Sequence, residues 1–128
     1  HRPTALRVIS MLMKNVFWPL GNDKTSSYDE FVEAVGEYNQ SVAPDSTKWD
    51  PAQVVCKGPV SVVYVAPWKD EDDRIEMVVS TDERPITMGE LLFTVHNESS
   101  DFFQDAPRRF FEGLSEMSPG TLKLHVGS

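Results

Sequence analysis

The strongest strand signal in the sequence is VSVVYVA, residues 60–66. It is rich in β-branched residues, which favour extended backbone and pack well on a sheet. Gly58 and Pro59 turn the chain just before it, and residues 53–57 ahead of that turn form a short candidate strand. Residues 74–81, RIEMVVST, largely alternate apolar with polar side chains and form the next strand. Together these stretches predict an antiparallel hairpin or meander.

Two helices are expected ahead of these strands. Residues 4–18 form the first, and Pro19 ends it. Its apolar side chains recur at three- and four-residue intervals, at Leu6, Ile9, Met13 and Val16. Residues 28–42 form the second, because Ser27 and Glu30 make a capping-box pattern. Its polar face carries only acidic charges, on Asp29, Glu30, Glu33 and Glu37.

Helix signals return after the strands. Thr87 and Glu90 repeat the capping-box pattern and start a helix that runs to about Asn97 or a little beyond. Residues 105–117 open with helix-start signals and suit a shorter last helix, although their Phe-Phe pair, 110–111, equally suits a strand. Residues 121–126, TLKLHV, alternate as a half-buried strand does.

The predicted order is ααβββα(α)β, which places the chain in the α+β class. We expect an antiparallel sheet of about four strands with two to four helices packed mainly on one face. The sequence shows no internal repeat and no linker long enough to divide it, so residues 1–128 are expected to form a single domain.

Composition narrows the function classes. The chain has 128 residues, with 12 Lys and Arg against 20 Asp and Glu, and a net charge of −8. Contact with phosphates needs clustered Lys and Arg, so neither a nucleic-acid partner nor an anionic membrane surface is expected. The sequence shows neither a transmembrane span nor the pattern of a signal peptide. A single cysteine, Cys56, forms no internal disulfide, which fits a reducing compartment, and a cytoplasmic location is expected.

Motifs for known chemistries are lacking. One Cys and three scattered His residues do not supply the paired ligands of a zinc site. The acidic run 70–73 lacks the alternating ligands and central glycine of a calcium loop. The sequence also contains no phosphate-binding glycine motif and no G-x-S-x-G nucleophile motif. No metal and no cofactor is therefore expected, and a buried, inert thiol is expected at Cys56.

His96 is the one plausible general base. It falls beside the apolar stripe of the helix that starts at Thr87, where a histidine is usually a hydrogen-bonded structural residue. The alternative is a small enzyme or ligand-binding domain with a pocket near His96. Its other candidate residues are Tyr38, Tyr64, Arg109 and Glu112. The last strand places His125 on its polar side, where exposure is expected.

Negative charge is concentrated along the chain. Residues 69–90 hold eight acidic and three basic residues, a net charge of −5. Such a field favours a basic protein partner, because opposite fields accelerate capture. The expected contact consists of Trp68 as an aromatic anchor with Asp70, Glu71, Asp72, Asp73 and Glu76. A merely solvated loop is the other interpretation of the same residues.

In its size, its acidity and its lack of catalytic motifs, the chain resembles the bacterial immunity proteins that neutralise toxins. This resemblance implies a toxin or nuclease domain as the basic partner, with carboxylates occupying the place of a phosphate backbone. It rests on general character and transfers no individual residue. A third possibility is a subunit of a larger assembly, with the Phe-Phe pairs at 102–103 and 110–111 and the N-terminal helix as its interface.

Overall fold

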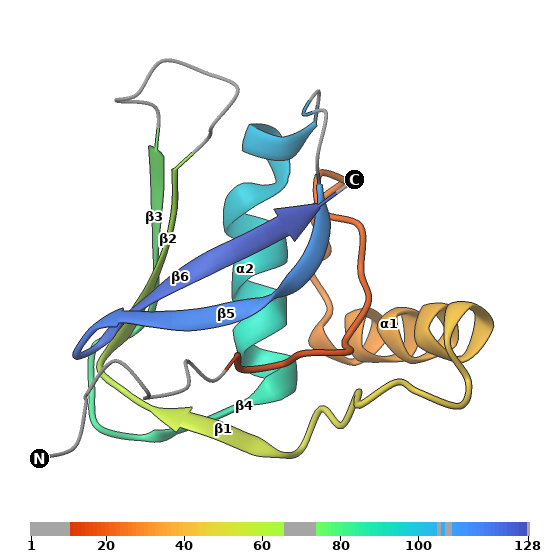
Figure 1. The fold of residues 1–128 in the computed structure, drawn as a ribbon, viewed down its shortest axis with the longest axis horizontal. Helices are drawn as coiled ribbons and strands as arrows, with labels where there is room; N and C mark the ends of the chain where they lie inside the picture. Colours follow the sequence, from red (N-terminus) through yellow and green to blue (C-terminus); the bar gives the residue numbers. More distant parts are fainter. Residues whose placement is uncertain (1–10, 66–73, 105, 107–108, 128) are drawn as a thin grey trace, which may run out of the picture.

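The computed structural model describes residues 11–65, 74–104, 106 and 109–127. These residues form an α+β fold, as the sequence predicts (Figure 1). The elements are α1 (Tyr28–Val42), β1 (Val54–Lys57), β2 (Val60–Val65), β3 (Arg74–Ser80), β4 (Pro85–Thr87), α2 (Met88–Phe103), β5 (Phe110–Ser118) and β6 (Thr121–Gly127). Of the helices in this described part, none is both long and apolar enough to cross a membrane.

The main sheet has the strand order β3-β2-β6-β5. Its outer pairs, β2 with β3 and β5 with β6, are antiparallel, whereas the central pair β2 and β6 is parallel. The expectation of a wholly antiparallel sheet is therefore wrong. Strands β2 and β6 pair in register from Ser61 opposite Thr121 to Val63 opposite Lys123. The chain between them includes α2, a crossover of the kind that a parallel pair requires.

A second sheet of two strands pairs β1 with β4. The stretch expected as a strand at 53–57 is thus a strand, but it lies outside the main sheet. Its partner β4 is a strand of three residues that begins at Pro85. Proline is tolerated at the first position of an edge strand, because its missing N–H then costs no ladder bond.

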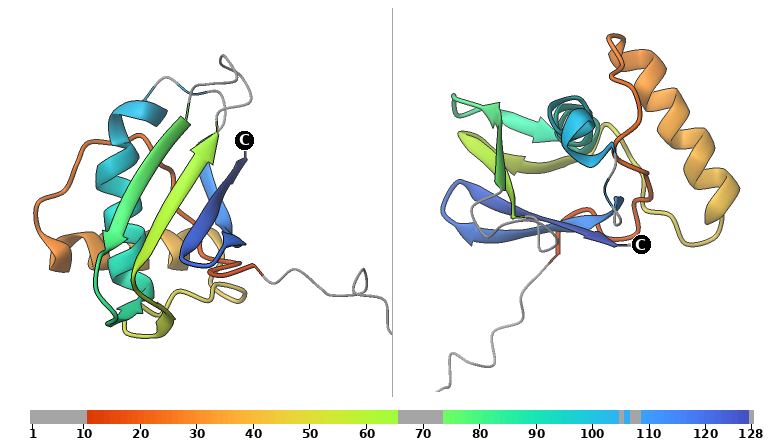
Figure 2. Two further views of the ribbon diagram at one scale, coloured as in Figure 1. Left: turned by 90° about the vertical axis from the view of Figure 1, so that its left-hand side faces the viewer. Right: turned by 90° about the horizontal axis from the view of Figure 1, so that it is seen from above.

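The two helices lie in successive layers, with α2 next to the main sheet. Helix α2 packs against the main sheet, and α1 packs against α2 on the side away from β2 and β3 (Figures 1 and 2). Both helices begin as predicted, since Ser27 accepts a hydrogen bond from the backbone N–H of Glu30 and Thr87 forms a complete capping box with Glu90. Helix α2 runs six residues further than the expected end at Asn97.

The expected first helix is wrong over its described part, 11–18. This segment runs irregularly along the free edge of β5, where Leu12 exchanges two backbone hydrogen bonds with Leu114. Trp18 accepts a third from Phe111. Met13 and Asn15 have φ angles of 59° and 67°, which a right-handed helix does not contain. The edge of β5 thus supplies the backbone partners that a helix would have supplied internally.

The expected last helix over 105–117 is also wrong where it is described, because residues 110–118 form β5. Phe111 and Leu114 point into the core while Phe110 is 41% exposed, so the alternative strand interpretation of Phe110 and Phe111 is confirmed.

The core lies between α2 and the main sheet. It combines side chains from both helices, from all four strands of that sheet and from segment 11–20. Its fully buried members include Val16, Leu20, Phe31, Val35, Val62, Met77, Leu91, Leu92, Val95, Phe103 and Leu114. The segment that failed to form a helix therefore still buries its apolar side chains.

Candidate functional site

The contact expected from the sequence is described only at one residue. Trp68, Asp70, Glu71, Asp72 and Asp73 lie outside the described residues. Glu76 is exposed on β3, paired in register with Val63 of β2. Two exposed valines lie near it, Val65 at 40% and Val78 at 56%. No ion pair is found for the Glu76 carboxylate within the described part of the chain.

His96 lies in the core, with only 1% of its surface exposed. Its Nδ1 accepts a hydrogen bond from Trp18 Nε1 at 3.1 Å, so Nε2 carries the proton and donates to the backbone oxygen of Asp23, also at 3.1 Å. Burial lowers the pKa of His96, and the hydrogen bond to Asp23 opposes that shift. A neutral imidazole with both nitrogens engaged is a structural connection between α2 and the segment before α1.

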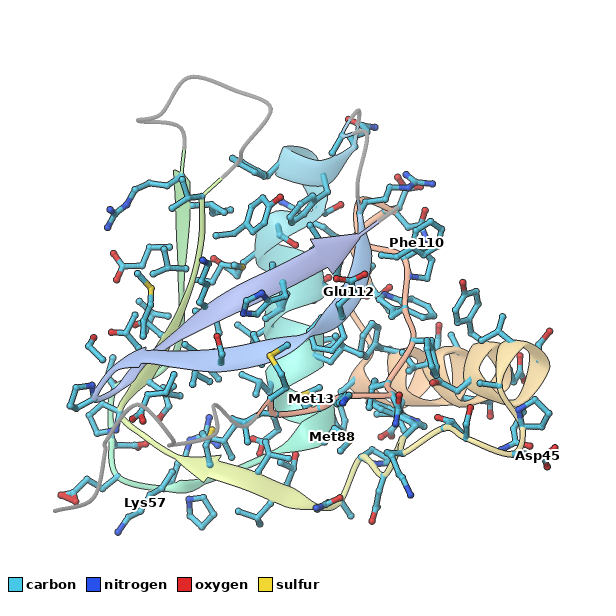
Figure 3. The ribbon with its side chains drawn as sticks, viewed as in Figure 1. Met13, Asp45, Lys57, Met88, Phe110 and Glu112 are labelled. Carbon is cyan, nitrogen blue, oxygen red and sulfur yellow. The ribbon has the colours of Figure 1, made fainter. Side chains whose placement is uncertain are left out.

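The other residues of the alternative pocket are not gathered around His96. Tyr38 and His96 both contact the Trp18 ring edge-on, at centroid distances of 5.8 Å. Tyr64 instead packs on the Phe103 ring at 5.0 Å, and Glu112 is exposed on β5 (Figure 3). Arg109 serves the fold through its backbone, which accepts a hydrogen bond from the N–H of Leu20.

His125 is half-buried rather than exposed. Its Nε2 lies 2.7 Å from Ser115 Oγ on the neighbouring strand β5. Burial and the charge of Lys123 lower the pKa of His125, while the carboxylate of Glu112 raises it. A serine hydroxyl hydrogen-bonded to a histidine ring supplies the nucleophile and the base of a catalytic arrangement, which also needs a third group to orient the base. However, no hydrogen bond joins Glu112 to the ring within the described structure, so the pair is better described as a side-chain link between β5 and β6.

Cys56 is half-buried in β1, where burial raises the pKa of its thiol. A raised pKa reduces the thiolate fraction, which is the opposite of what a nucleophilic cysteine needs. Within the described residues, no group of three or more His, Cys, Asp or Glu side chains is placed to hold a metal ion.

A hollow of about 520 Å³ lies between α1 and the turn that follows it. We call it the α1 hollow. Its lining residues are Glu33, Gly36, Glu37, Asn39, Gln40, Thr47 and Trp49. Two acidic residues one helical turn apart, Glu33 and Glu37, therefore line the same space as one indole ring.

Asn39, which lines this hollow, is held in place by hydrogen bonds. It is 1% exposed, and its amide donates to the backbone oxygens of Phe17 and Val35, both at 2.8 Å. Its Oδ1 accepts from the Phe17 N–H at 2.9 Å and from Thr47 Oγ1 at 2.8 Å. Thr47 Oγ1 in turn accepts from the backbone N–H of Trp49 at 3.1 Å. All four hydrogen-bonding positions of the Asn39 side chain are thus used, and the turn that carries Trp49 is held against α1.

The segment that forms the α1 hollow is strongly acidic. Residues 28–50 contain six acidic residues and one basic residue, Lys48. Figure 3 shows one of the six, Asp45, beyond the C-terminal end of α1. No carboxylate of α1 forms an ion pair with a described residue. By contrast, the Glu90 carboxylate on α2 is bound at 2.8 Å by Arg84.

A second hollow, of about 510 Å³, lies between the start of α1 and the start of α2. Tyr28, Phe93, Arg84 and Glu90 are among its lining residues. Its two charged side chains neutralise each other. The capping hydrogen bond from Thr87 is the main reason that the pKa of Glu90 is lowered. This hollow therefore presents an internally paired charge, whereas the α1 hollow presents unpaired carboxylates.

Comparison with family models, with curated proteins and with solved structures finds no match for this chain.

Proposed function

We propose that this chain is a binding module that recognises a basic protein partner. The observation that carries the proposal is the surface of α1, where Asp29, Glu30, Glu33 and Glu37 are all exposed and no base lies in the same helix. Within the described structure none of these carboxylates has a cationic partner. A partner rich in Lys and Arg would supply the missing counter-charges.

Helix α1 keeps this charge at a cost to its own stability. Asp29 and Glu33, and likewise Glu33 and Glu37, are four residues apart, a spacing at which like charges repel by about 0.2–0.5 kcal/mol per pair. The acids of the first turn suit the positive end of the helix dipole, but Glu37 lies in the C-terminal half, which favours cations. The four-residue spacing of these acids and the position of Glu37 do not stabilise the helix. A role in binding therefore accounts for these two features better than a role in folding does.

A second acidic region belongs to the same proposal. The segment with Trp68 and Asp70–Asp73, together with Glu76, remains the contact predicted from the sequence. In the described structure Glu76 is exposed and unpaired, which supports that prediction at one position. Helix α1 lies on the far side of α2 from β3, so Glu76 and the carboxylates of α1 belong to different faces of the molecule (Figure 2).

A toxin or nuclease domain is the type of partner that the immunity-protein interpretation implies. A nuclease surface that binds phosphates is basic, and unpaired carboxylates can occupy the same positions. Opposite fields raise association rates by about 10- to 1000-fold, and salt removes much of that gain. Fast, salt-sensitive capture is therefore the kinetic signature expected of this module.

The test begins with affinity capture from the cells that produce the protein. Association rates with the captured partner are then measured by stopped flow at 50 and 500 mM salt. We expect the quadruple variant D29N/E30Q/E33Q/E37Q to associate about tenfold more slowly or worse at low salt, with a flatter salt dependence.

Two further variants complete the comparison. The variant D70N/E71Q/D72N/D73N reports on the other acidic region, and E98Q/E116Q removes two exposed carboxylates that neither region contains. A specific partner whose association with the wild-type chain does not depend on salt would contradict the proposal. A partner that is itself acidic would do the same.

A further inference from the structure

We propose that the α1 hollow receives an arginine side chain of the protein partner. This inference rests on the proposed function and goes further, because it names the group that the site recognises and the position where it binds. The occupant follows from charge and shape together. The hollow is lined by two acidic residues of α1, Glu33 and Glu37, and by the Trp49 indole from the turn that follows the helix.

The chemistry of the walls matches a guanidinium group. Glu33 and Glu37 are one helical turn apart and both line the hollow, so a single cation inside it lies within reach of two carboxylates. A guanidinium is planar, carries five donors and forms paired hydrogen bonds with carboxylates. Its flat face also stacks on an indole ring, which attracts cations through its π system. A lysine ammonium would gain the charge but neither the fork geometry nor the stacking.

Gly36 also lines the hollow. It lies in the middle of α1, between Glu33 and Glu37, where glycine weakens a helix relative to alanine. Packing does not require it, because a Cβ at this position would meet Trp49 Nε1 at 3.6 Å and Cδ1 at 3.8 Å, ordinary contact distances. A methyl group would therefore fit in contact with the indole, and the Trp49 ring lies close over Gly36, which is part of the lining of the hollow.

The hollow is also formed in advance of binding. The side chain of Asn39 is fully hydrogen-bonded, and Thr47 connects it to the backbone of Trp49. Trp49 is half-buried and packs against the core, so its ring is restrained before a ligand arrives. A pre-formed site loses less conformational freedom on binding than a mobile one.

The experiment uses the whole chain and a probe with a single charge. The tripeptide Ac-Gly-Arg-Gly-NH2 is titrated into 15N-labelled protein while the indole N–H signal of Trp49 is followed by NMR. That signal is assigned by its loss in the variant W49F. We expect a saturable shift with a millimolar dissociation constant, and binding of Ac-Gly-Lys-Gly-NH2 that is at least threefold weaker.

Three variants separate the hollow from the general field of the protein. E33Q/E37Q is expected to abolish the saturable shift, whereas E98Q/E116Q, which removes the same charge elsewhere, should change the dissociation constant by less than twofold. Gly36→Ala fills the floor of the hollow and is expected to weaken binding fivefold or more. Because alanine favours the helix, this loss would come with a melting temperature at least as high as that of the wild type.

Several results would overturn the inference. These are equal weakening by E33Q/E37Q and E98Q/E116Q, unchanged binding in Gly36→Ala, or equal affinity for the arginine and lysine tripeptides. Its failure is distinguishable from failure of the proposed function. If the hollow does not bind arginine but the quadruple variant of α1 still associates slowly with the partner, only the proposed arginine site is contradicted. If the tripeptide binds but no basic partner is captured, only the proposed function is contradicted.

Discussion

Replacement of His96 by phenylalanine tests the role of the buried imidazole. Phenylalanine keeps an aromatic ring beside Trp18 and Phe31 but removes both nitrogens. The indole N–H of Trp18 then loses its acceptor, and an orphaned buried donor costs about 1–3 kcal/mol. Loss of the hydrogen bond to the Asp23 backbone oxygen costs about 0.5–1.5 kcal/mol of stability. The cost is smaller if a water molecule replaces the imidazole as the donor, because Asp23 is exposed. We expect the free energy of unfolding to fall by about 2–3 kcal/mol.

The same variant should change how stability depends on pH. The pKa of His96 is lowered in the folded state from its ordinary value of 6.5. Near and below pH 6.5 the unfolded chain therefore binds a proton more readily than the folded one, so acid favours unfolding. The stabilisation is complete above that pH and is lost as the pH falls towards the lowered pKa. Between pH 7.5 and 5.5 the wild type should lose stability, and His96→Phe should lose less.

Urea unfolding followed by circular dichroism measures both effects, with an unchanged m-value as evidence that the unfolded state is the same. His125 also has a lowered pKa, so the variant His125→Gln provides the control for its share of the slope. Glu90 contributes only near and below pH 4.5, outside the range used. A loss below about 1 kcal/mol, or a wild-type slope in His96→Phe between pH 7.5 and 5.5, would refute the structural role given to the imidazole.

Four substitutions test the packing around the helices by urea unfolding. Gly36→Ala should stabilise by about 0.5–1 kcal/mol, and a loss would show that the indole cannot accept a methyl group. Gly89→Ala should destabilise, because its Cβ would overlap the Tyr28 hydroxyl, and Tyr28→Phe in the same chain should restore part of the loss. Thr87→Val removes the N-cap oxygen of α2 and should cost about 1 kcal/mol, whereas no loss would make the capping box dispensable. Gly21→Ala should cost at least about 2 kcal/mol, since φ is 94° at Gly21 and the new Cβ would lie 2.6 Å from the backbone oxygen of Phe103. A smaller loss would mean that the backbone around Gly21 relaxes to accept the methyl group.

The elements predicted correctly from the sequence are those with local signals. Helix α1 matches the predicted range 28–42, with Phe31 and Val35 buried as the spacing indicates. Strands β2, β3 and β6 lie within one residue of their predicted ends, because β-branched runs and period-two alternation depend on near neighbours. The charge pattern of α1 was likewise visible in the sequence.

Non-local pairing accounts for most of the errors. Residues 11–18 carry a helical spacing of apolar side chains, and Met13 and Val16 are indeed buried, but the edge of β5 captures the backbone. A cap residue and a proline at the start of residues 105–117 favour a helix, whereas Phe110 and Phe111 equally suit the strand that forms there as β5. Whether β2 and β6 run parallel is decided by the path of α2 between them, and no local pattern records it.

The hollow beside α1 was beyond prediction for a related reason. The acids of α1 and Trp49 are both plain in the sequence, and what joins them is the single amide of Asn39. That amide binds the backbone N–H and C=O of Phe17, and the turn is also tied to the same segment by a hydrogen bond from Lys48 N to Asn15 O.

The irregular course of residues 11–20 and the hollow are therefore one feature of the fold. If 11–18 were helical, the N–H of Phe17 would bond within that helix, and the buried Asn39 would lose a partner at a cost of about 1–3 kcal/mol. In the structure the unwound segment instead offers Phe17 to Asn39, and Asn39 in turn holds Thr47. The irregular backbone of residues 11–18, which contradicts the helix prediction, thus also positions Trp49 near Glu33 and Glu37.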